Sequence, residues 1–282
     1  MNISAMTREE NHRLAVPQDL LRAAINGCAD ATGRVAAQIA ADVRMKDFVL
    51  LSLEGVVDDY DGFRNGSTRL AETLGPLMVQ NEAGDTVVEV FDRNVGRIEE
   101  GVRYHQTRQG GDIHTDSVNR PEPMQLLILA CASPAAIGGE SIVIRAGAIV
   151  KRLGEIPGVV ETLSQPFWFE GRGMAFEPNL FQMPVLSQTR GAPSFRYLRP
   201  YIESAHERAG DPLTPRQVFA FDVLDAHLEL SDLQYRLTLR QGDLLIADDT
   251  RVFHGRTSFI DGIGPGAWTA GRCMLRYWIA PQ

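Results

Sequence analysis

From about residue 84 to its C-terminus the chain is divided into short apolar runs separated by turn residues. The runs read TVVEVF, DIHTD, MQLLILACA, ESIVIRA, LLIADD and GRCMLRYWI, with turn sequences such as RPEP and IGGE between them. Runs of this length, bounded by Gly and Pro and rich in β-branched residues, are typical of β-strands. The sequence therefore predicts a fold that is mainly β, with flanking helices.

Helices are expected on both sides of these strands. In about residues 1–80, PQDLLRAAINGCADA and TGRVAAQIAADVRM have apolar residues at helical spacing, and the run DFVLLSL that follows resembles a strand. Another helix is expected over 214–230, with Thr214 as N-cap and Pro215 at its first position. LTLRQGDLLIADD predicts a hairpin around Gln241–Asp243, and the weakly periodic region of about 154–210 predicts an active-site insert. Without repeats or linkers, residues 1–282 are expected to form one domain.

Composition limits the function classes. A net charge of −8 over 282 residues argues against nucleic acid or an anionic membrane as the main partner, and leaves a small molecule and a homo-oligomer open. No leader segment is evident and no apolar run approaches the roughly 18 residues of a membrane span. Cys28, Cys131 and Cys273 lie far apart in apolar surroundings, so we expect them to be core thiols in a cytoplasmic protein.

The stretch GGDIHTDS places His114 and Asp116 two residues apart. In a strand, side chains at this spacing point to the same face and could bind one metal ion, although a polar strand edge or turn would also produce the pattern. His254, at the end of an apolar strand far downstream, is a third candidate ligand. Two imidazoles and one carboxylate are the facial triad of non-haem Fe(II) oxygenases. His12, His206 and His227 are interpreted as surface residues, and His105 as a residue near the site.

The last run, GRCMLRYWI, places Arg272, Met274 and Arg276 on one face of a strand. Two arginines directed into a β-structure need anionic partners, because an unpaired buried guanidinium is costly. A dicarboxylate that chelates the metal at one end and meets Arg272 at the other would supply one, through a bidentate contact. Pairing with Asp or Glu of this acidic chain is the alternative.

Four blocks together carry a family resemblance: IHTDS, PAAIGGESIVI, LRQGDLLIADDTRVFHGRTSF and RCMLRYWI. In this order, from about residue 104 to the C-terminus, they resemble the TauD/TfdA family of Fe(II)/2-oxoglutarate-dependent oxygenases, and its clavaminate synthase-like members in particular. The resemblance implies a double-stranded β-helix, or jelly roll, with Fe(II) as cofactor and 2-oxoglutarate and O₂ as cosubstrates.

The same resemblance assigns roles to individual residues. It implies that His114, Asp116 and His254 bind the iron and that Arg272 pairs with the distal carboxylate of 2-oxoglutarate. Ser141 stands where the family usually has threonine and would hydrogen-bond the same cosubstrate. The resemblance also implies that Arg276 contacts the substrate.

Oxidation of a substrate C–H bond, with release of succinate and CO₂, is the implied reaction. Hydroxylation is the default outcome, while desaturation and ring closure stay open. Asn119, Arg120, Trp168 and Phe176 are further candidates for the substrate pocket, although local packing would explain each of them equally well. A cationic pocket with an aromatic wall suits a small metabolite that bears a carboxylate, such as an amino acid or a biosynthetic intermediate.

Two other readings of the residues remain. The same triad could hold zinc for a hydrolytic reaction. Alternatively, a jelly-roll chain could bind a ligand without catalysing a reaction. Neither reading accounts for Arg272 and Ser141 as well as the oxygenase does.

Overall fold

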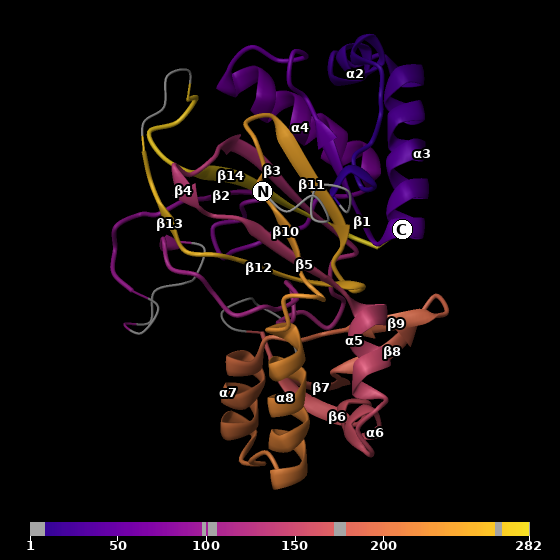
Figure 1. Ribbon diagram of the computed structural model, residues 1–282, viewed down its shortest axis with the longest axis vertical. Helices are drawn as coiled ribbons and strands as arrows, with labels where there is room; N and C mark the ends of the chain where they lie inside the picture. Colours follow the sequence, from indigo (N-terminus) through magenta and orange to yellow (C-terminus); the bar gives the residue numbers. More distant parts are fainter. Residues whose placement is uncertain (1–8, 98–99, 101–105, 172–178, 263–266, 282) are drawn as a thin grey trace.

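The computed structural model describes residues 9–97, 100, 106–171, 179–262 and 267–281. Its elements form antiparallel sheets with helices above and below them (Figure 1). The helices are α2 (Gln18–Ile25), α3 (Ala29–Lys46), α4 (Tyr60–Leu74), α5 (Ala146–Leu153), α6 (Val159–Leu163), α7 (Arg199–Ala209) and α8 (Pro215–Leu228). The strands are β1 (Phe48–Ser52), β2 (Val87–Val90), β3 (Leu126–Ser133), β4 (Ile137–Gly138), β5 (Ser141–Arg145), β6 (Pro166–Glu170), β7 (Leu180–Pro184), β8 (Leu186–Thr189), β9 (Ala192–Phe195), β10 (Tyr235–Leu237), β11 (Asp243–Asp248), β12 (Val252–Arg256), β13 (Phe259–Ile260) and β14 (Cys273–Ile279).

The largest sheet has five strands in the order β1-β11-β3-β14-β2, all antiparallel. One face of this sheet packs against α2, α3 and α4, as Figure 1 shows. Alternate residues of β14 point into this layer, among them Leu275 and Tyr277, and they meet Phe63 of α4 and Ile39 of α3 in one apolar cluster. The three N-terminal helices are therefore held on the sheet by a continuous core.

The opposite face of the five-stranded sheet meets a three-stranded sheet of order β10-β5-β12. Met274 of β14 and Leu245 of β11 pack there against Val143 of β5 and Val252 of β12. Because side chains alternate along a strand, His254 lies on the same face of β12 as Val252 and is directed between the sheets. The space between the sheets is therefore where residues of β12 and β14 meet.

The outer face of the three-stranded sheet is covered by a second layer, built from α5, α6, α7, α8 and the small sheets β6-β7 and β8-β9. Ile142, Ile144 and Phe253 of the sheet belong to the apolar core of this layer. The helix expected after Thr214 is present, and the Thr214 and Gln217 side chains form a reciprocal capping box at its start.

Several expectations from the sequence need correction. The antiparallel sheets and flanking helices are confirmed, but the described helices hold more residues than the described strands, so the chain is mixed α/β. The hairpin around Gln241–Asp243 is wrong, because β10 pairs with β5 whereas β11 pairs with β1 and β3. That segment instead crosses from one sheet to the other. A local sequence pattern marks the turn but does not choose the partner strands.

Burial also differs from the expectation at three residues. Cys28 is exposed, although Cys131 and Cys273 are buried as expected. His12 is buried and stacks on the Phe48 ring at 4.0 Å. His206 is buried as well. Its Nδ1 donates to the Asp211 carbonyl and its Nε2 accepts from the Trp168 backbone N–H, so both polar atoms are satisfied away from water. None of the described helices has the length and apolar character to cross a membrane.

Candidate iron centre

The segment that carries His114 and Asp116 is held by long-range contacts. The expectation of a strand over DIHTD is wrong, since only His114 makes a bridge, with His254 of β12. The His114 N–H donates to the His254 carbonyl at 2.9 Å and the His254 N–H donates back at 2.8 Å. Thr115 exchanges hydrogen bonds with Tyr197, and the Asp116 N–H donates to Asp249 Oδ2 at 2.9 Å. The two histidines are thus backbone partners.

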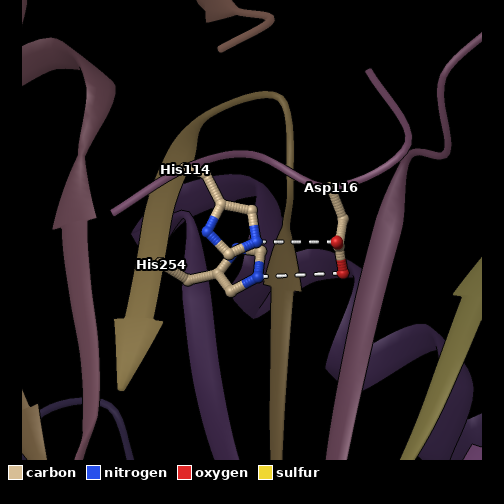
Figure 2. Close-up of side chains that lie close together, drawn as sticks. All are labelled: His114, Asp116 and His254. Carbon is tan, nitrogen blue, oxygen red and sulfur yellow. Dashed lines mark ion pairs between the residues drawn. The ribbon is translucent and has the colours of Figure 1, made fainter. Parts of the chain in front are cut away.

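Three potential ligand side chains converge at this bridge (Figure 2). Nε2 of His114 lies 3.6 Å from Asp116 Oδ1, and Nε2 of His254 lies 3.8 Å from Asp116 Oδ2. One ligand atom from each residue lies within 4.8 Å of the others. Both histidines are 7% exposed, so the cluster is largely shielded from water.

The remaining ring nitrogens orient both imidazoles for ligation. Nδ1 of His114 donates to the Asp112 carbonyl at 2.7 Å, which leaves the Nε2 lone pair directed at Asp116. Nδ1 of His254 lies 3.2 Å from Asp249 Oδ1, at ion-pair distance but not in hydrogen-bond alignment. A carboxylate or carbonyl behind each metal-binding imidazole is the usual arrangement in metal sites. The donor set therefore fits a divalent metal ion.

Charge in the cluster is strongly coupled. Burial alone would raise the pKa of Asp116, but the positive charge of Arg276 and the hydrogen bond from His114 lower it far below its usual value. Burial would lower the pKa of His114, yet contact with the Asp116 carboxylate gives a net increase. Burial raises the pKa of Asp249, and its contact with His254 offsets this only in part. Asp116 is therefore the anionic centre of the cluster.

The triad opens into a cavity of about 40 Å³ between the two main sheets. Its other lining residues are Val90, Leu129, Ser141, Gly255, Arg256, Arg272, Met274 and Arg276. The expectation that Arg272, Met274 and Arg276 share one face of the last strand is confirmed, since all three line the same cavity. Arg272 is 3% exposed and lies 5.3 Å from the Phe259 ring centroid. Ser141 begins β5 and is likewise buried.

Arg256 is a cavity residue that sequence reasoning missed. It lies on β12 opposite Ser141, and its guanidinium is 4.7 Å from the same Phe259 ring that Arg272 approaches. Nη2 of Arg256 donates to the backbone carbonyls of Thr107, at 3.0 Å, and Gln109. Its position two residues after His254 was the available signal, because residues i and i+2 of a strand share a face.

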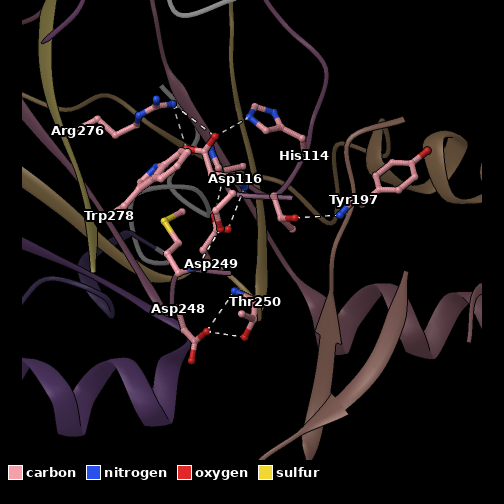
Figure 3. A network of polar contacts seen from close by, with 12 residues as sticks. His114, Asp116, Tyr197, Asp248, Asp249, Thr250, Arg276 and Trp278 are labelled. Atoms are coloured by element: carbon pink, nitrogen blue, oxygen red, sulfur yellow. Dashed lines mark hydrogen bonds and ion pairs between the residues drawn. The ribbon is translucent and has the colours of Figure 1, made fainter. Parts of the chain in front are cut away.

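Arg276 and Trp278 both contact the Asp116 carboxylate (Figure 3). Nη1 of Arg276 donates to Asp116 Oδ2 at 3.2 Å, while Nε donates to Gln80 Oε1 at 2.8 Å. The indole Nε1 of Trp278 donates to the same Oδ2 at 3.1 Å. Sequence reasoning missed Asp249, Trp278 and Gln80. For Trp278 a signal existed, because it continues the alternation of Arg272, Met274 and Arg276.

The remaining substrate candidates have other partners. Asn119 Nδ2 donates to the Gly171 carbonyl at 3.2 Å, and Arg120 Nη1 donates to the Val79 carbonyl at 2.6 Å. The indole Nε1 of Trp168 donates to Asp211 Oδ2 at 3.1 Å, beyond the end of α7. None of these three lines the cavity described above. Phe176 and His105 lie outside the described residues.

The fold and the site together define a class of protein: an antiparallel β scaffold that presents two histidines and one carboxylate beside a cation-lined cavity, as in mononuclear non-haem iron enzymes. The sequence matches the family model "Taurine catabolism dioxygenase TauD, TfdA family" over residues 47–278. The chain therefore belongs to the TauD/TfdA family of Fe(II)/2-oxoglutarate-dependent non-haem iron dioxygenases. Fe(II) and 2-oxoglutarate are the cofactor and cosubstrate of this class.

Solved structures similar to this chain come from the same class. A structure titled asparagine oxygenase (AsnO) is 16% identical with a TM-score of 0.70, covering 96% of this chain and 93% of that one. The non-haem iron oxygenase OrfP, solved with Fe and alpha-ketoglutaric acid, is 16% identical with a TM-score of 0.65, covering 95% and 93%. PvcB from Pseudomonas aeruginosa is 18% identical with a TM-score of 0.61, covering 86% and 79%. At this identity the likeness concerns the fold. Among curated proteins, none matches the sequence.

Proposed function

We propose that this chain hydroxylates an unactivated C–H bond of a small metabolite that bears a carboxylate, with an amino acid or a related biosynthetic intermediate as the substrate class. The observation that carries the proposal is the convergence of the His114, Asp116 and His254 side chains on a buried cavity that three arginines also line. Structures of similar fold are described with 3-hydroxyasparagine and with (3S)-hydroxy-L-Arg, which are hydroxylated amino acids.

In this proposal, Nε2 of His114, Nε2 of His254 and one oxygen of Asp116 bind Fe(II), and three facial ligands leave positions open for the cosubstrates. Bound iron and 2-oxoglutarate supply the oxidative chemistry, in which O₂ is consumed and 2-oxoglutarate is decarboxylated to succinate and CO₂. Arg272 pairs with the distal carboxylate of 2-oxoglutarate and Ser141 donates a hydrogen bond to it. Both residues line the cavity beside the triad, which supports these roles.

The other contribution of the chain is positioning and exclusion of water. The reciprocal backbone bonds between His114 and His254 keep the imidazoles at a ring separation of 4.6 Å. Asp112 and Asp249 orient the rings from behind, and the aliphatic walls of Val90, Leu129 and Met274 shield the cavity. Retention of Asp116 favours hydroxylation over halogenation, because halogenating members give up this carboxylate.

Arg276 is proposed as the partner of an anionic substrate group, since its guanidinium reaches the cavity at the triad. Asn119, Arg120, Trp168 and Phe176 stay predictions as substrate contacts. For the architecture, we infer a double-stranded β-helix within a single domain of residues 1–282, supported by two facing antiparallel sheets. A cytoplasmic location is inferred from the absence of paired cysteines in the sequence pattern and from the free thiols.

The test of the cofactor assignment is an anaerobic titration of metal-free protein with Fe(II) and 2-oxoglutarate, monitored by the visible charge-transfer band of the chelate. The band should form in the wild type, weaken in Arg272→Ala and vanish in His114→Ala. Arg152→Ala is the matched control, because Arg152 pairs with Asp232 at the surface, far from the cavity lining. No band in the iron-loaded wild type would sink the oxygenase proposal and return the zinc hydrolase and the binding protein as readings.

The substrate class has its own test. Amino acids and simple N-acyl derivatives are screened for substrate-dependent succinate formation and for a product heavier by one oxygen atom. A response confined to carboxylate-bearing compounds, and lost in Arg276→Met, supports the proposal. A chelate band without any such response would leave the enzyme class intact and reject the substrate class.

A further inference from the structure

Trp278 is the last cavity-side residue of β14 and the only described tryptophan that contacts the triad. Its side chain is 5% exposed and packs with Met124 and Leu127, so the ring is fixed in place. From this position the indole Nε1–H donates to Asp116 Oδ2 at 3.1 Å, as Figure 3 shows. The ring therefore presents one donor, in one direction, to one oxygen of the candidate iron carboxylate.

The two oxygens of Asp116 have different surroundings. Oδ2 accepts the indole N–H of Trp278 and the shorter of the two contacts with Arg276, 3.2 Å against 3.4 Å to Oδ1. Oδ1 lies 3.6 Å from Nε2 of His114. The two donors differ in what they can do next. A guanidinium is charged and can turn toward an incoming anion, whereas an indole N–H is neutral, packed and able only to donate.

We propose that Trp278 is a positioning residue for the metal site. Its indole N–H holds Oδ2 of Asp116, so that the carboxylate presents Oδ1 to the metal and binds through a single oxygen. This contact persists when Arg276 engages a substrate, because Trp278 has no charge to share with an anion. One-oxygen binding by Asp116 keeps the opposite coordination positions free for the cosubstrates. The inference rests on the proposed function, since it takes the triad to be a metal site.

Packing alone is the competing explanation for Trp278, because the ring also fills space between Met124 and Leu127. Trp278→Phe separates the two explanations, since phenylalanine keeps most of the apolar ring and removes the donor. The matched control is Trp168→Phe. Trp168 also donates its indole N–H to a carboxylate oxygen at 3.1 Å, that of Asp211, but it does not line the cavity. Both substitutions delete the same type of hydrogen bond.

The experiment is a titration of the metal-free proteins with Co(II), followed by the visible absorption of the bound ion. Loss of a group that orients a metal ligand typically weakens metal affinity about 10- to 100-fold. For a neutral donor we expect the lower end, a rise of about 10-fold in Kd for Trp278→Phe, with a changed Co(II) spectrum as Asp116 shifts toward two-oxygen binding. Trp168→Phe should retain the wild-type Kd and spectrum.

A second measurement on the wild type does not depend on the stability of a variant. Co(II) bound beside Trp278 should quench its fluorescence, whereas Zn(II), which has a filled d shell, should not. The quenching should disappear in Trp278→Phe and survive in Trp168→Phe and Trp268→Phe. A Kd for Trp278→Phe within twofold of the wild type, with an unchanged spectrum, would overturn the inference and leave the metal site standing. Failure of the wild type to bind Co(II) would instead overturn the proposed function.

Discussion

Asp249 is expected to control metal affinity although it is not itself a candidate ligand. Its side chain is 1% exposed and contacts two of the three ligand residues. Oδ2 accepts the backbone N–H of Asp116 at 2.9 Å, and Oδ1 lies 3.2 Å from Nδ1 of His254 (Figure 3). Asp249→Ala removes both contacts at once. The His254 ring then loses the group that keeps its proton on Nδ1, and Asp116 loses its backbone anchor.

The size of the effect follows from this geometry. Loss of one orienting partner costs about 10- to 100-fold in metal affinity, or about 1.4 to 2.7 kcal/mol. Because Asp249 serves two ligand residues, we expect the upper end, a rise of about 100-fold in Kd. The variant also leaves a buried N–H without its acceptor, which costs about 1–3 kcal/mol of unfolding free energy. Metal-free Asp249→Ala should therefore also unfold at a lower denaturant concentration.

Calorimetric titration with Co(II), together with urea unfolding of each metal-free protein, measures both effects. Asp248→Ala is the matched control. Asp248 is the adjacent carboxylate in sequence, and it accepts from the backbone N–H and the hydroxyl of Thr250 rather than from a triad residue. It removes the same charge nearby, so general electrostatics affects both variants alike. Equal metal affinity in the two variants would refute the argument that Asp249 acts through His254 and Asp116.

The remaining predictions concern thiols, pH and the cosubstrate end of the cavity. In the folded protein only Cys28 should react rapidly with a thiol reagent at pH 8, while Cys131 and Cys273 should react only in denaturant, because they are buried and burial raises the pKa of each to about 12. Since the unfolded chain releases these two protons near pH 9, the free energy of unfolding should be intact below about pH 9 and fall between pH 9 and 12. Its slope against pH, measured by urea unfolding, should be shallower in Cys131→Ala. Gly139→Ala should weaken 2-oxoglutarate binding in the anaerobic titration, because a Cβ there would lie 2.9 Å from Nε of Arg272.

Each of these has a contrary outcome. Modification of all three thiols in the folded chain at one rate would contradict the burial argument, and a slope that is the same in Cys131→Ala would remove the thiols as its cause. For Gly139, at φ +71, the control is Gly191→Ala, at φ +77 with no atom within 4 Å of the added Cβ. It carries the same backbone strain without the clash. Equal cosubstrate affinity in both variants would show that Arg272 tolerates the intrusion.

Features that depend on local periodicity could be predicted from the sequence. The alternation of β14 correctly put Arg272, Met274 and Arg276 on one face, because a strand reverses its side chains at every residue whatever lies beside it. The start of α8 was equally local, since Thr214 and Pro215 determine it through capping and a fixed φ. The choice of strand partners was not local. The same QGD turn residues serve a hairpin or a crossing between sheets, and here they cross.

The candidate site shows the same division at the level of single side chains. His254 and the arginines lie on regular strands, so their direction could be worked out from spacing. Asp249 and Asp248 are neighbours of the same type, and only the turn after β11 decides which one faces the triad. That choice depends on Asp116, which is distant in sequence. Outer contacts of this kind have no spacing rule and are found only in three dimensions.

The segment after Ile113 shows why the triad is placed correctly although the predicted strand is wrong. Asp116 is followed by Ser117 at φ +51, which a continuing strand does not allow, so the chain turns away immediately after delivering its second ligand. What replaces the strand is a set of bonds from distant elements. Tyr197 binds Thr115, Asp249 binds Asp116, and Arg196, buried against Phe169, donates to the carbonyls of Val118, Arg120 and Pro121. The ligand segment is thus tied to β12 on one side and to the β9–α7 layer on the other. Because Tyr197 also donates to Asp225 of α8, a change in the packing of α7 and α8 would reach the iron ligands through two bonds, whereas the ligands on β12 and the arginines on β14 would stay in place.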